Sequence, residues 1–145
     1  NILLSTGASN WSELLNAKKI IDESKLTLLH CVSSYPTKAE NVNLPRIDKI
    51  REIHPKVGYS GHFKGIDDAI AALSYNIDYI EKHFTIDNNL PGRDNQFSIT
   101  TQELKKLVNY KNNFFEMNKD LGNEMQELEL DVHENYRSRW TLDSK

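Results

Sequence analysis

The sequence contains a single cysteine, Cys31, so no disulfide can form within the chain. It has no apolar run near the roughly 18 residues that a transmembrane helix needs, and no charged-then-apolar leader precedes the first apolar segment. Positive charge is not in excess either, because 18 Lys and Arg stand against 21 Asp and Glu, a net charge of −3. These absences argue against secreted disulfide scaffolds, membrane proteins and nucleic-acid-binding proteins, and they predict a cytoplasmic location.

What the sequence does contain is the composition of a folded domain. Hydrophobic residues make up 38% and charged residues 27% of its 145 residues, as in ordinary globular proteins. The sequence opens on Asn1 without a methionine or a linker and enters an apolar run at Ile2. We interpret this opening as a strand entered at its first residue, and therefore expect the chain to be a piece of a longer protein.

Apolar segments and amphipathic segments alternate along the chain. Short buried strands are expected at residues 2–4, 26–32, 57–60 and 79–84. Helical spacing predicts helices at 11–23, at 44–54, around Ile66 to Leu73, and from a capping box at Thr100–Glu103 to about residue 122. A charged tail follows from Asn123, so the predicted domains are 1–122 and the tail 123–145.

Four strand–helix units predict an α/β fold with a parallel sheet. Four units are half of a (β/α)₈ TIM barrel, which typically needs about 250 residues. A small doubly wound sheet is the alternative. No GxGxxG fingerprint follows any predicted strand, which counts against a dinucleotide-binding fold.

Polar residues gather where each predicted strand ends. Catalytic groups of parallel α/β folds lie at these carboxyl ends, and packing alone does not require such residues at four successive ends. The four segments are Ser5–Gly7, His30–Thr37, Gly58–His62 and Glu81–Thr85.

Two histidines, His62 and His83, close neighbouring predicted strands, which lie about 4.8 Å apart in a sheet. They could share one divalent metal ion, of the Mn²⁺ or Mg²⁺ type, with positions left for water and substrate oxygens. The alternative is a hydrogen-bonded pair without metal. Of the other histidines, His30 is expected in the core or behind the residues that line the site, His54 at the surface or near a helix C-terminus, and His133 in solvent.

Glu81 shares side-chain parity with His83, so both are expected to point to the same face of the sheet. A carboxylate in a barrel interior positions a metal-bound water or pairs with a lysine. Lys82 has the opposite parity and is expected to face the helical layer.

Three serines at strand ends, Ser5, Ser33 and Ser60, could donate hydrogen bonds to a phosphate or carboxylate, although serine is also common in turns. Tyr35 is interpreted either as the wall of a sugar pocket or as a structural tyrosine. Asp94 follows Pro91-Gly92-Arg93 in a loop, where an aspartate ordinarily faces solvent or forms a turn.

These strings together resemble the sialic acid synthase family, which includes synthases of N-acetylneuraminate, legionaminate and pseudaminate and related spore-coat polysaccharide proteins. The matching motifs run in order from residue 1 to about 122, and each lies at a predicted strand end or in the loop after it. They are STG (5–7), HCVSSYPT (30–37), Asn43-Leu44, GYSGH (58–62), EKHFT (81–85) and PGRD (91–94).

The resemblance implies a (β/α)₈ barrel of which this chain supplies strands five to eight. It implies that His62 and His83 bind the metal, with Glu81 beside it as a catalytic carboxylate. It further implies a catalytic and sugar-binding role for Asp94. The remaining substrate contacts that it implies are Tyr35 with the amino sugar, and Ser5, Ser33 and Ser60 with phosphoenolpyruvate.

The implied reaction condenses phosphoenolpyruvate with an N-acylated amino sugar such as N-acetylmannosamine. Carbon 3 of phosphoenolpyruvate attacks the open-chain aldehyde, which the metal polarises. Water then adds at carbon 2, and phosphate leaves by C–O cleavage. The resemblance places such a transferase in the synthesis of sialic acids for lipopolysaccharide or capsule.

The family also has parts that this sequence does not contain. Its first barrel half supplies lysines for phosphoenolpyruvate, and its C-terminal antifreeze-like domain takes part in homodimers. We therefore expect the chain alone, with two open sheet edges, to be inactive and prone to associate. The competing hypotheses are another metal-dependent barrel aldolase or epimerase, and a non-catalytic homologue that binds sugar or serves as a scaffold.

Overall fold

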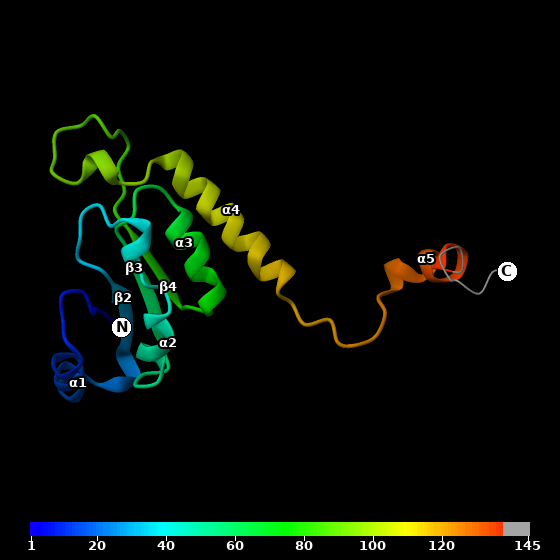
Figure 1. Cartoon of the computed structure of the whole chain (residues 1–145), viewed down its shortest axis with the longest axis horizontal. Coiled ribbons are helices and arrows are strands. Elements are labelled where there is room, and N and C mark those ends of the chain that lie inside the picture. Colours follow the sequence, from blue (N-terminus) through cyan, green and yellow to red (C-terminus); the bar gives the residue numbers. More distant parts are fainter. Residues whose placement is uncertain (138–145) are drawn as a thin grey trace. The chain divides into compact units, whose positions relative to one another are not determined.

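The fold is built on one parallel sheet, seen in a computed structural model that describes residues 1–137 (Figure 1). The four strands are hydrogen-bonded in chain order, with β1 and β4 at the two edges of the sheet. Their bounds are β1 Ile2–Ser5, β2 Leu26–Cys31, β3 Val57–Gly61 and β4 Tyr79–Lys82. The predicted α/β fold with a parallel sheet of four strands is thus confirmed.

Helices α1 to α3 connect the strands, as parallel pairing requires, and α4 follows the last strand. They are α1 Trp11–Ile20, α2 Arg46–Arg51, α3 Asp67–Ala72 and α4 Thr101–Met117, with short 3₁₀ turns η1 Glu23–Lys25, η2 Ala39–Asn41, η3 Leu73–Tyr75 and η4 Asn95–Phe97. Helix α1 begins where the sequence predicts it, because Asn10 and Glu13 form a capping box: the Asn10 side chain accepts from the Glu13 N–H and the Glu13 carboxylate from the Asn10 N–H.

The core lies on the face of the sheet that carries these helices. Residues that are paired across parallel strands point to the same face, so Leu28 and Val57 meet there. The buried cluster joins β2 and β3 to α1, α2 and α3 through Leu14, Leu26, Leu28, Val42, Ile47, Ile50, Val57, Tyr59 and Ala72. The opposite face carries Ser60 and Glu81 as register partners, and it leaves Leu3 and Tyr79 exposed.

Several predicted elements end earlier than their hydrophobic pattern indicates. Helix α1 ends at Ile20, because Asp22 then caps the turn η1 by accepting from the Ser24 N–H. Strand β4 ends at Lys82, and beyond it Phe84 forms only an isolated bridge with Ile99. Helix α4 ends at Met117, before a polar segment that begins with Asn118. Local capping and pairing therefore set these boundaries.

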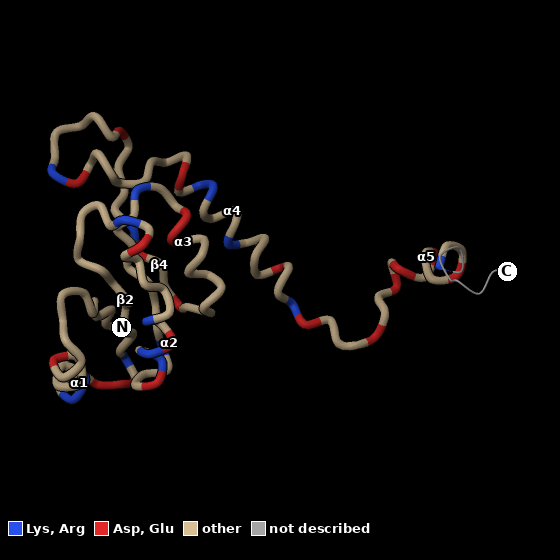
Figure 2. The backbone as a smooth tube through the Cα atoms, in the orientation of Figure 1, with Lys and Arg blue, Asp and Glu red and all other residues tan. Residues whose placement is uncertain are grey.

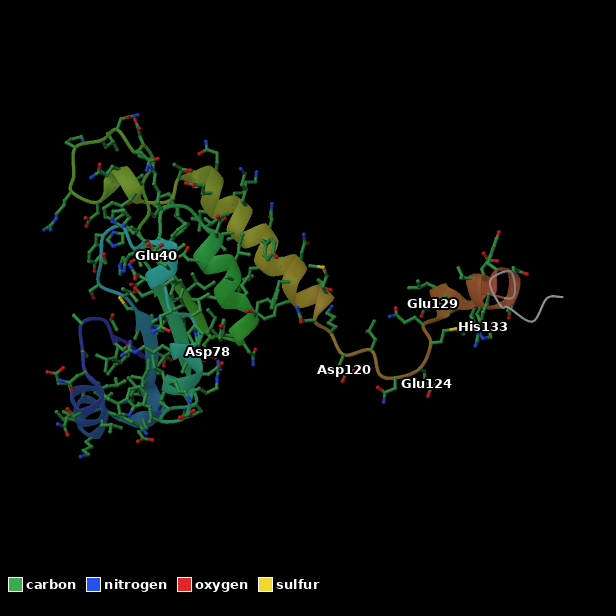
Figure 3. The ribbon with its side chains drawn as sticks, in the orientation of Figure 1. Glu40, Asp78, Asp120, Glu124, Glu129 and His133 are labelled. Carbon is green, nitrogen blue, oxygen red and sulfur yellow. The ribbon has the colours of Figure 1, made fainter. Side chains whose placement is uncertain are left out.

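The chain divides into two compact units, of which the first is Asn1–Phe114 and the second begins at Phe115. The second unit contains α4's last residues, the turn η5 Glu127–Glu129 and a helix, α5 Leu130–Asn135, within the segment predicted as a charged tail. Figure 2 shows its acidic residues, and Figure 3 labels Asp120, Glu124 and Glu129. His133, also labelled, is exposed as predicted. The domain limits 1–122 and 123–145 stay a prediction.

Within residues 1–137, no helix has both the length and the apolar character that crossing a membrane requires.

Two buried histidines tie the loops to the sheet. His30 is fully buried, as predicted, and its Nε2 lies 2.8 Å from the Val42 carbonyl oxygen. His54 is also buried, with 2% of its surface exposed and its Nε2 2.8 Å from the Leu26 carbonyl oxygen. Of the two positions predicted for His54, the surface is wrong, because the chain after α2 turns back toward the start of β2 and carries this ring inward. His54 does lie just past the C-terminus of α2, where its N–H donates to the Ile50 carbonyl.

The fold is expected to lose stability as the pH falls from about 7 to about 5. Burial lowers the pKa of His30, and the Arg46 charge lowers it further, although the hydrogen bond to Val42 opposes both. The folded state therefore binds fewer protons than the unfolded state below about pH 6.5, and its stability falls by at most about 1.4 kcal/mol per pH unit. Urea midpoints measured across this range test the effect. His30→Gln keeps an N–H donor without titrating, so an equally steep dependence in that variant would contradict the assignment.

Candidate functional site

Three aromatic rings from separate segments meet beyond the carboxyl ends of β3 and β4. The His62 and His83 ring centroids lie 5.2 Å apart. The Tyr35 ring, from the loop after β2, lies 4.2 Å from the His62 ring and 5.8 Å from the His83 ring. The structure therefore brings together both predicted metal ligands and the predicted sugar contact.

Backbone hydrogen bonds fix the two histidines where the strands have ended. The Thr37 N–H donates to the His62 carbonyl at 2.9 Å, and Thr37 forms an isolated parallel bridge with Phe63. The Ile99 N–H donates to the His83 carbonyl at 2.8 Å. Each histidine is thus held between its own strand and a returning loop, so the pair does not depend on side-chain packing alone.

The environment of His62 favours the neutral form of its imidazole. The residue is 7% exposed, and its Nδ1 lies 3.1 Å from the Val32 carbonyl oxygen. Burial lowers the pKa of His62 and the bond to Val32 opposes this, while the nearby His83 and Lys82 lower it further and Glu81 raises it. Because a carbonyl can only accept, Nδ1 carries the proton and Nε2 keeps its lone pair. A neutral ring whose other nitrogen bonds a carbonyl is the usual arrangement of a metal-binding histidine.

Asp94 approaches His83 from the loop after β4. Its Oδ2 lies 3.9 Å from His83 Nδ1, and both side chains are more than a third exposed. The loop is fastened behind Asp94, whose carbonyl accepts from the N–H and the hydroxyl of Ser98. Asp94 is therefore half-buried at the site, where solvent screens its pairing with His83.

Ser60 and Glu81 form a second polar pair on the face of the sheet opposite the helices. They are register partners on β3 and β4, and Ser60 Oγ donates to Glu81 Oε1 at 2.8 Å. Glu81 is exposed and shares this face, as its parity predicts, while Lys82 points the other way into the helical layer. The prediction for Lys82 is confirmed, and it rules out Lys82 as an ion-pair partner for Glu81.

The other two serines lie farther along the same edge. Ser33 follows β2 and reaches back toward Gly7, where an added Cβ would be 2.3 Å from Ser33 Oγ. Ser5 ends the edge strand β1, two strands away from β3, and its Oγ accepts from the Gly7 N–H at 3.4 Å. Ser5 and Ser33 are thus close to one another, while Ser60 lies nearer the histidines. The roles assigned to all these residues stay predictions.

The donors present fit a divalent metal that takes most of its ligands from outside this chain. The two imidazoles lie 5.2 Å apart with their planes tilted by 58°, and His62 Nε2 keeps its lone pair. Among residues 1–137, no group of three or more His, Cys, Asp and Glu side chains is placed to hold a metal ion. Mn²⁺ and Mg²⁺ accept water and substrate oxygens in the remaining positions, so a two-histidine contribution is chemically adequate.

Two site residues escaped the sequence argument. Cys31 Sγ lies 3.7 Å from His62 Nδ1, and the Phe97 ring lies 5.7 Å from the His83 ring and 6.2 Å from the Tyr35 ring. The register could have found Cys31, because it pairs with Ser60 and so shares its face. No periodic signal marks Phe97, which enters from the turn η4 at the end of an irregular loop.

Comparison with known proteins gives one answer from sequence and from structure. The NeuB family matches residues 1–125. The N,N'-diacetyllegionaminic acid synthase of Campylobacter jejuni is 38% identical over 112 residues, which cover 73% of this chain and 34% of that protein. The N-acetylneuraminate-9-phosphate synthase of Drosophila melanogaster is 36% identical over 118 residues, covering 78% and 32% respectively.

A solved structure has the same arrangement. The N-acetylneuraminic acid synthetase of Leptospira borgpetersenii superposes with a TM-score of 0.78 at 34% identity, over 99% of this chain and 50% of that chain. The four-stranded sheet is therefore a half-barrel similar to part of that enzyme. The chain spans about a third of the length of the curated relatives that it matches. With its parallel half-barrel and a match over most of its length, this chain belongs to the NeuB family.

Proposed function

We propose that this chain forms half of the active site of a sialic-acid-type synthase, which condenses phosphoenolpyruvate with an N-acylated amino sugar. The observation that carries this is the His62–His83 pair, with the Tyr35 ring and the Asp94 carboxylate beside it at the carboxyl edge of the sheet. The relatives with related sequences, named as synthases of legionaminic and neuraminic acids, support the same reaction.

The side chains divide into groups for each substrate. Tyr35 is half exposed against the His62 ring, so its face is available to a sugar, and Asp94 can accept hydrogen bonds from sugar hydroxyls. Ser5 and Ser33 gather near Gly7, where hydroxyl and backbone donors suit a phosphate or carboxylate. The amino sugar is thus proposed to lie beside the histidines, with phosphoenolpyruvate along the β1–β2 edge.

The side chains around the two histidines are proposed to bind a metal and to orient a water. A divalent metal bound between them, Mn²⁺ or Mg²⁺, would supply Lewis-acid polarisation of the sugar aldehyde. His62 offers Nε2 because Val32 holds the proton on Nδ1. Ser60 donates to Glu81 Oε1, which leaves Glu81 Oε2 to orient a water.

The bonds made and broken balance without a further reactant. Carbon 3 of phosphoenolpyruvate bonds to the aldehyde carbon, whose oxygen gains a proton. Water adds to carbon 2 and loses a proton. Phosphate then leaves with its bridging oxygen and takes up the proton of the carbon 2 hydroxyl, as carbon 2 becomes a ketone. Holding both substrates in one orientation is the main contribution that such a site makes to the rate.

The same proposal covers the whole protein. We take the four strands as strands five to eight of a TIM barrel and the upstream half as the source of lysines for phosphoenolpyruvate. We also propose a cytoplasmic homodimer, in which the segment from about residue 123 leads to a further domain. A sequence upstream of Asn1 that contains barrel strands ending in lysine would support this arrangement.

The test is phosphate release by a protein that carries this chain within a complete barrel. It is incubated with phosphoenolpyruvate, Mn²⁺ and a panel of N-acylhexosamines, with and without a 6-phosphate. We expect release that requires both the metal and one class of acceptor. Absence of release with every acceptor, from a folded protein, would favour the scaffold hypothesis instead.

A further inference from the structure

Behind the two histidines, on the helix-side face of the sheet, lies a buried ion pair. Lys82 Nζ is 3.0 Å from both carboxylate oxygens of Asp68 on α3, and the two side chains are 5% and 1% exposed. Lys82 Nζ also donates to the Phe63 carbonyl at 2.7 Å. All three ammonium protons therefore have an acceptor, which is what a charge at this depth requires.

The Lys82 ammonium is linked to the two histidines through its neighbours in the sequence. Lys82 directly precedes His83, and the carbonyl that it binds belongs to Phe63, the residue after His62. One side chain on β4 therefore holds the segment that leaves β3. It does so at the point where regular β3–β4 pairing stops, since Gly61 and Lys82 are the last register partners.

Neighbouring residues fix the position of the ion pair itself. Tyr59 Oη donates to Asp68 Oδ2 at 2.8 Å, so Asp68 is held from β3 as well as from β4. Position 61 has no room for a side chain, because an added Cβ would lie 2.3 Å from Asp68 Oδ2. The carboxylate is thus held by hydrogen bonds from Tyr59 and Lys82, with Gly61 packed close against it.

We propose that Lys82 and Asp68 are positioning residues that set the separation of the His62 and His83 rings. The β3–β4 register ends at Gly61 and Lys82, so the histidines lie past the regular sheet, and the Lys82–Phe63 bond ties the extension of β3 to the last residue of β4. The inference deepens the proposed function, because its consequence for metal binding rests on the two histidines being ligands.

A second lysine in the chain provides a matched control. Lys18 Nζ donates to the Ile53 carbonyl at 2.6 Å and pairs with Glu23 at 3.0 Å, so it joins a carbonyl and a carboxylate as Lys82 does. It lies on α1, and Ile53 follows α2, so its link touches neither β3 nor β4. Loss of Lys18 therefore removes similar bonds while leaving the histidine segments untouched.

The experiment uses a protein that carries this chain within a complete barrel and compares it with two variants, Lys82→Met/Asp68→Asn and Lys18→Met. The double substitution leaves no unpaired buried charge, and asparagine can still accept from Tyr59, so this variant is designed to remain folded. The first readout is the nuclear Overhauser effect between the His62 and His83 rings, recorded without metal. The second is the dissociation constant for Mn²⁺, from the loss of the free-ion electron paramagnetic resonance signal.

We expect the inter-ring effect to disappear in Lys82→Met/Asp68→Asn and the Mn²⁺ dissociation constant to rise about tenfold or more, the scale of supporting groups around metal ligands. Lys18→Met should leave both unchanged. A retained inter-ring effect in the double variant, an unchanged Mn²⁺ affinity, or an equal loss in Lys18→Met would each overturn the proposal. If the unmodified complete-barrel protein keeps the inter-ring effect but binds no Mn²⁺, the metal part of the proposed function fails, and the ring measurement alone decides the positioning role.

Discussion

Replacing His62 or His83 with alanine is expected to lower phosphate release by at least about a hundredfold in a protein with a complete barrel. The backbone of each histidine is held by a hydrogen bond to its carbonyl, from the Thr37 N–H at His62 and from the Ile99 N–H at His83. We therefore expect the loss of one imidazole to leave the other in place. In the proposed site, the substitution removes one of the two imidazole ligands of the metal that would polarise the sugar aldehyde. Removing a single preorganised electrostatic contact at a reacting centre typically costs this much or more.

Rates at saturating phosphoenolpyruvate separate this effect from weaker substrate binding. His133→Ala is the matched control, because His133 is exposed on α5 in the other compact unit, and its rate should match that of the unmodified protein. Circular dichroism of each variant checks that the sheet is retained. Normal turnover in both His62→Ala and His83→Ala would show that the metal assignment is wrong, whatever the reaction proves to be.

Much of this site follows from two simple periodicities. The alternation of apolar strands with amphipathic helices gives the parallel sheet, and the carboxyl ends of its strands give the edge where His62 and His83 meet. Parity along β4 correctly separates Glu81 from Lys82. These predictions work because neighbouring parallel strands share one direction and one pleat, so the sequence position of a residue fixes its edge and its face.

The remaining features depend on tertiary contacts that no local pattern encodes. His54 follows a helix and looks like a surface histidine, yet the turn after α2 carries it to the Leu26 carbonyl. Phe97 joins the aromatic group only because the loop after β4 folds back over the strand ends. The sequence places Lys82 toward the helical layer but does not identify its partner, because α3 carries both Asp67 and Asp68. The rotation of α3 about its axis turns Asp68 toward Lys82.

Replacing Asp68, the buried ion-pair partner of Lys82, with alanine is expected to lower the free energy of unfolding by about 3–5 kcal/mol. The Lys82 ammonium would remain 5% exposed with only the Phe63 carbonyl as an acceptor, and an uncompensated buried charge is among the costliest single changes in a protein. The Tyr59 hydroxyl would lose its acceptor at the same time. The change in the free energy of unfolding is measured by urea unfolding, from the shift of the midpoint concentration when the m-value is unchanged.

The size of this effect should come from burial and not from the loss of an ion pair as such. Asp48→Ala removes a pair with Arg51 that also has a 3.0 Å contact, but the Asp48 side chain is 61% exposed. Its cost should stay below about 1 kcal/mol, as for other surface pairs. Removing both buried charges in Lys82→Met/Asp68→Asn should then recover part of the loss seen in Asp68→Ala. Equal destabilisation by Asp48→Ala and Asp68→Ala would contradict this account, and the ion pair behind the histidines would then contribute no more to the fold than a pair on its surface.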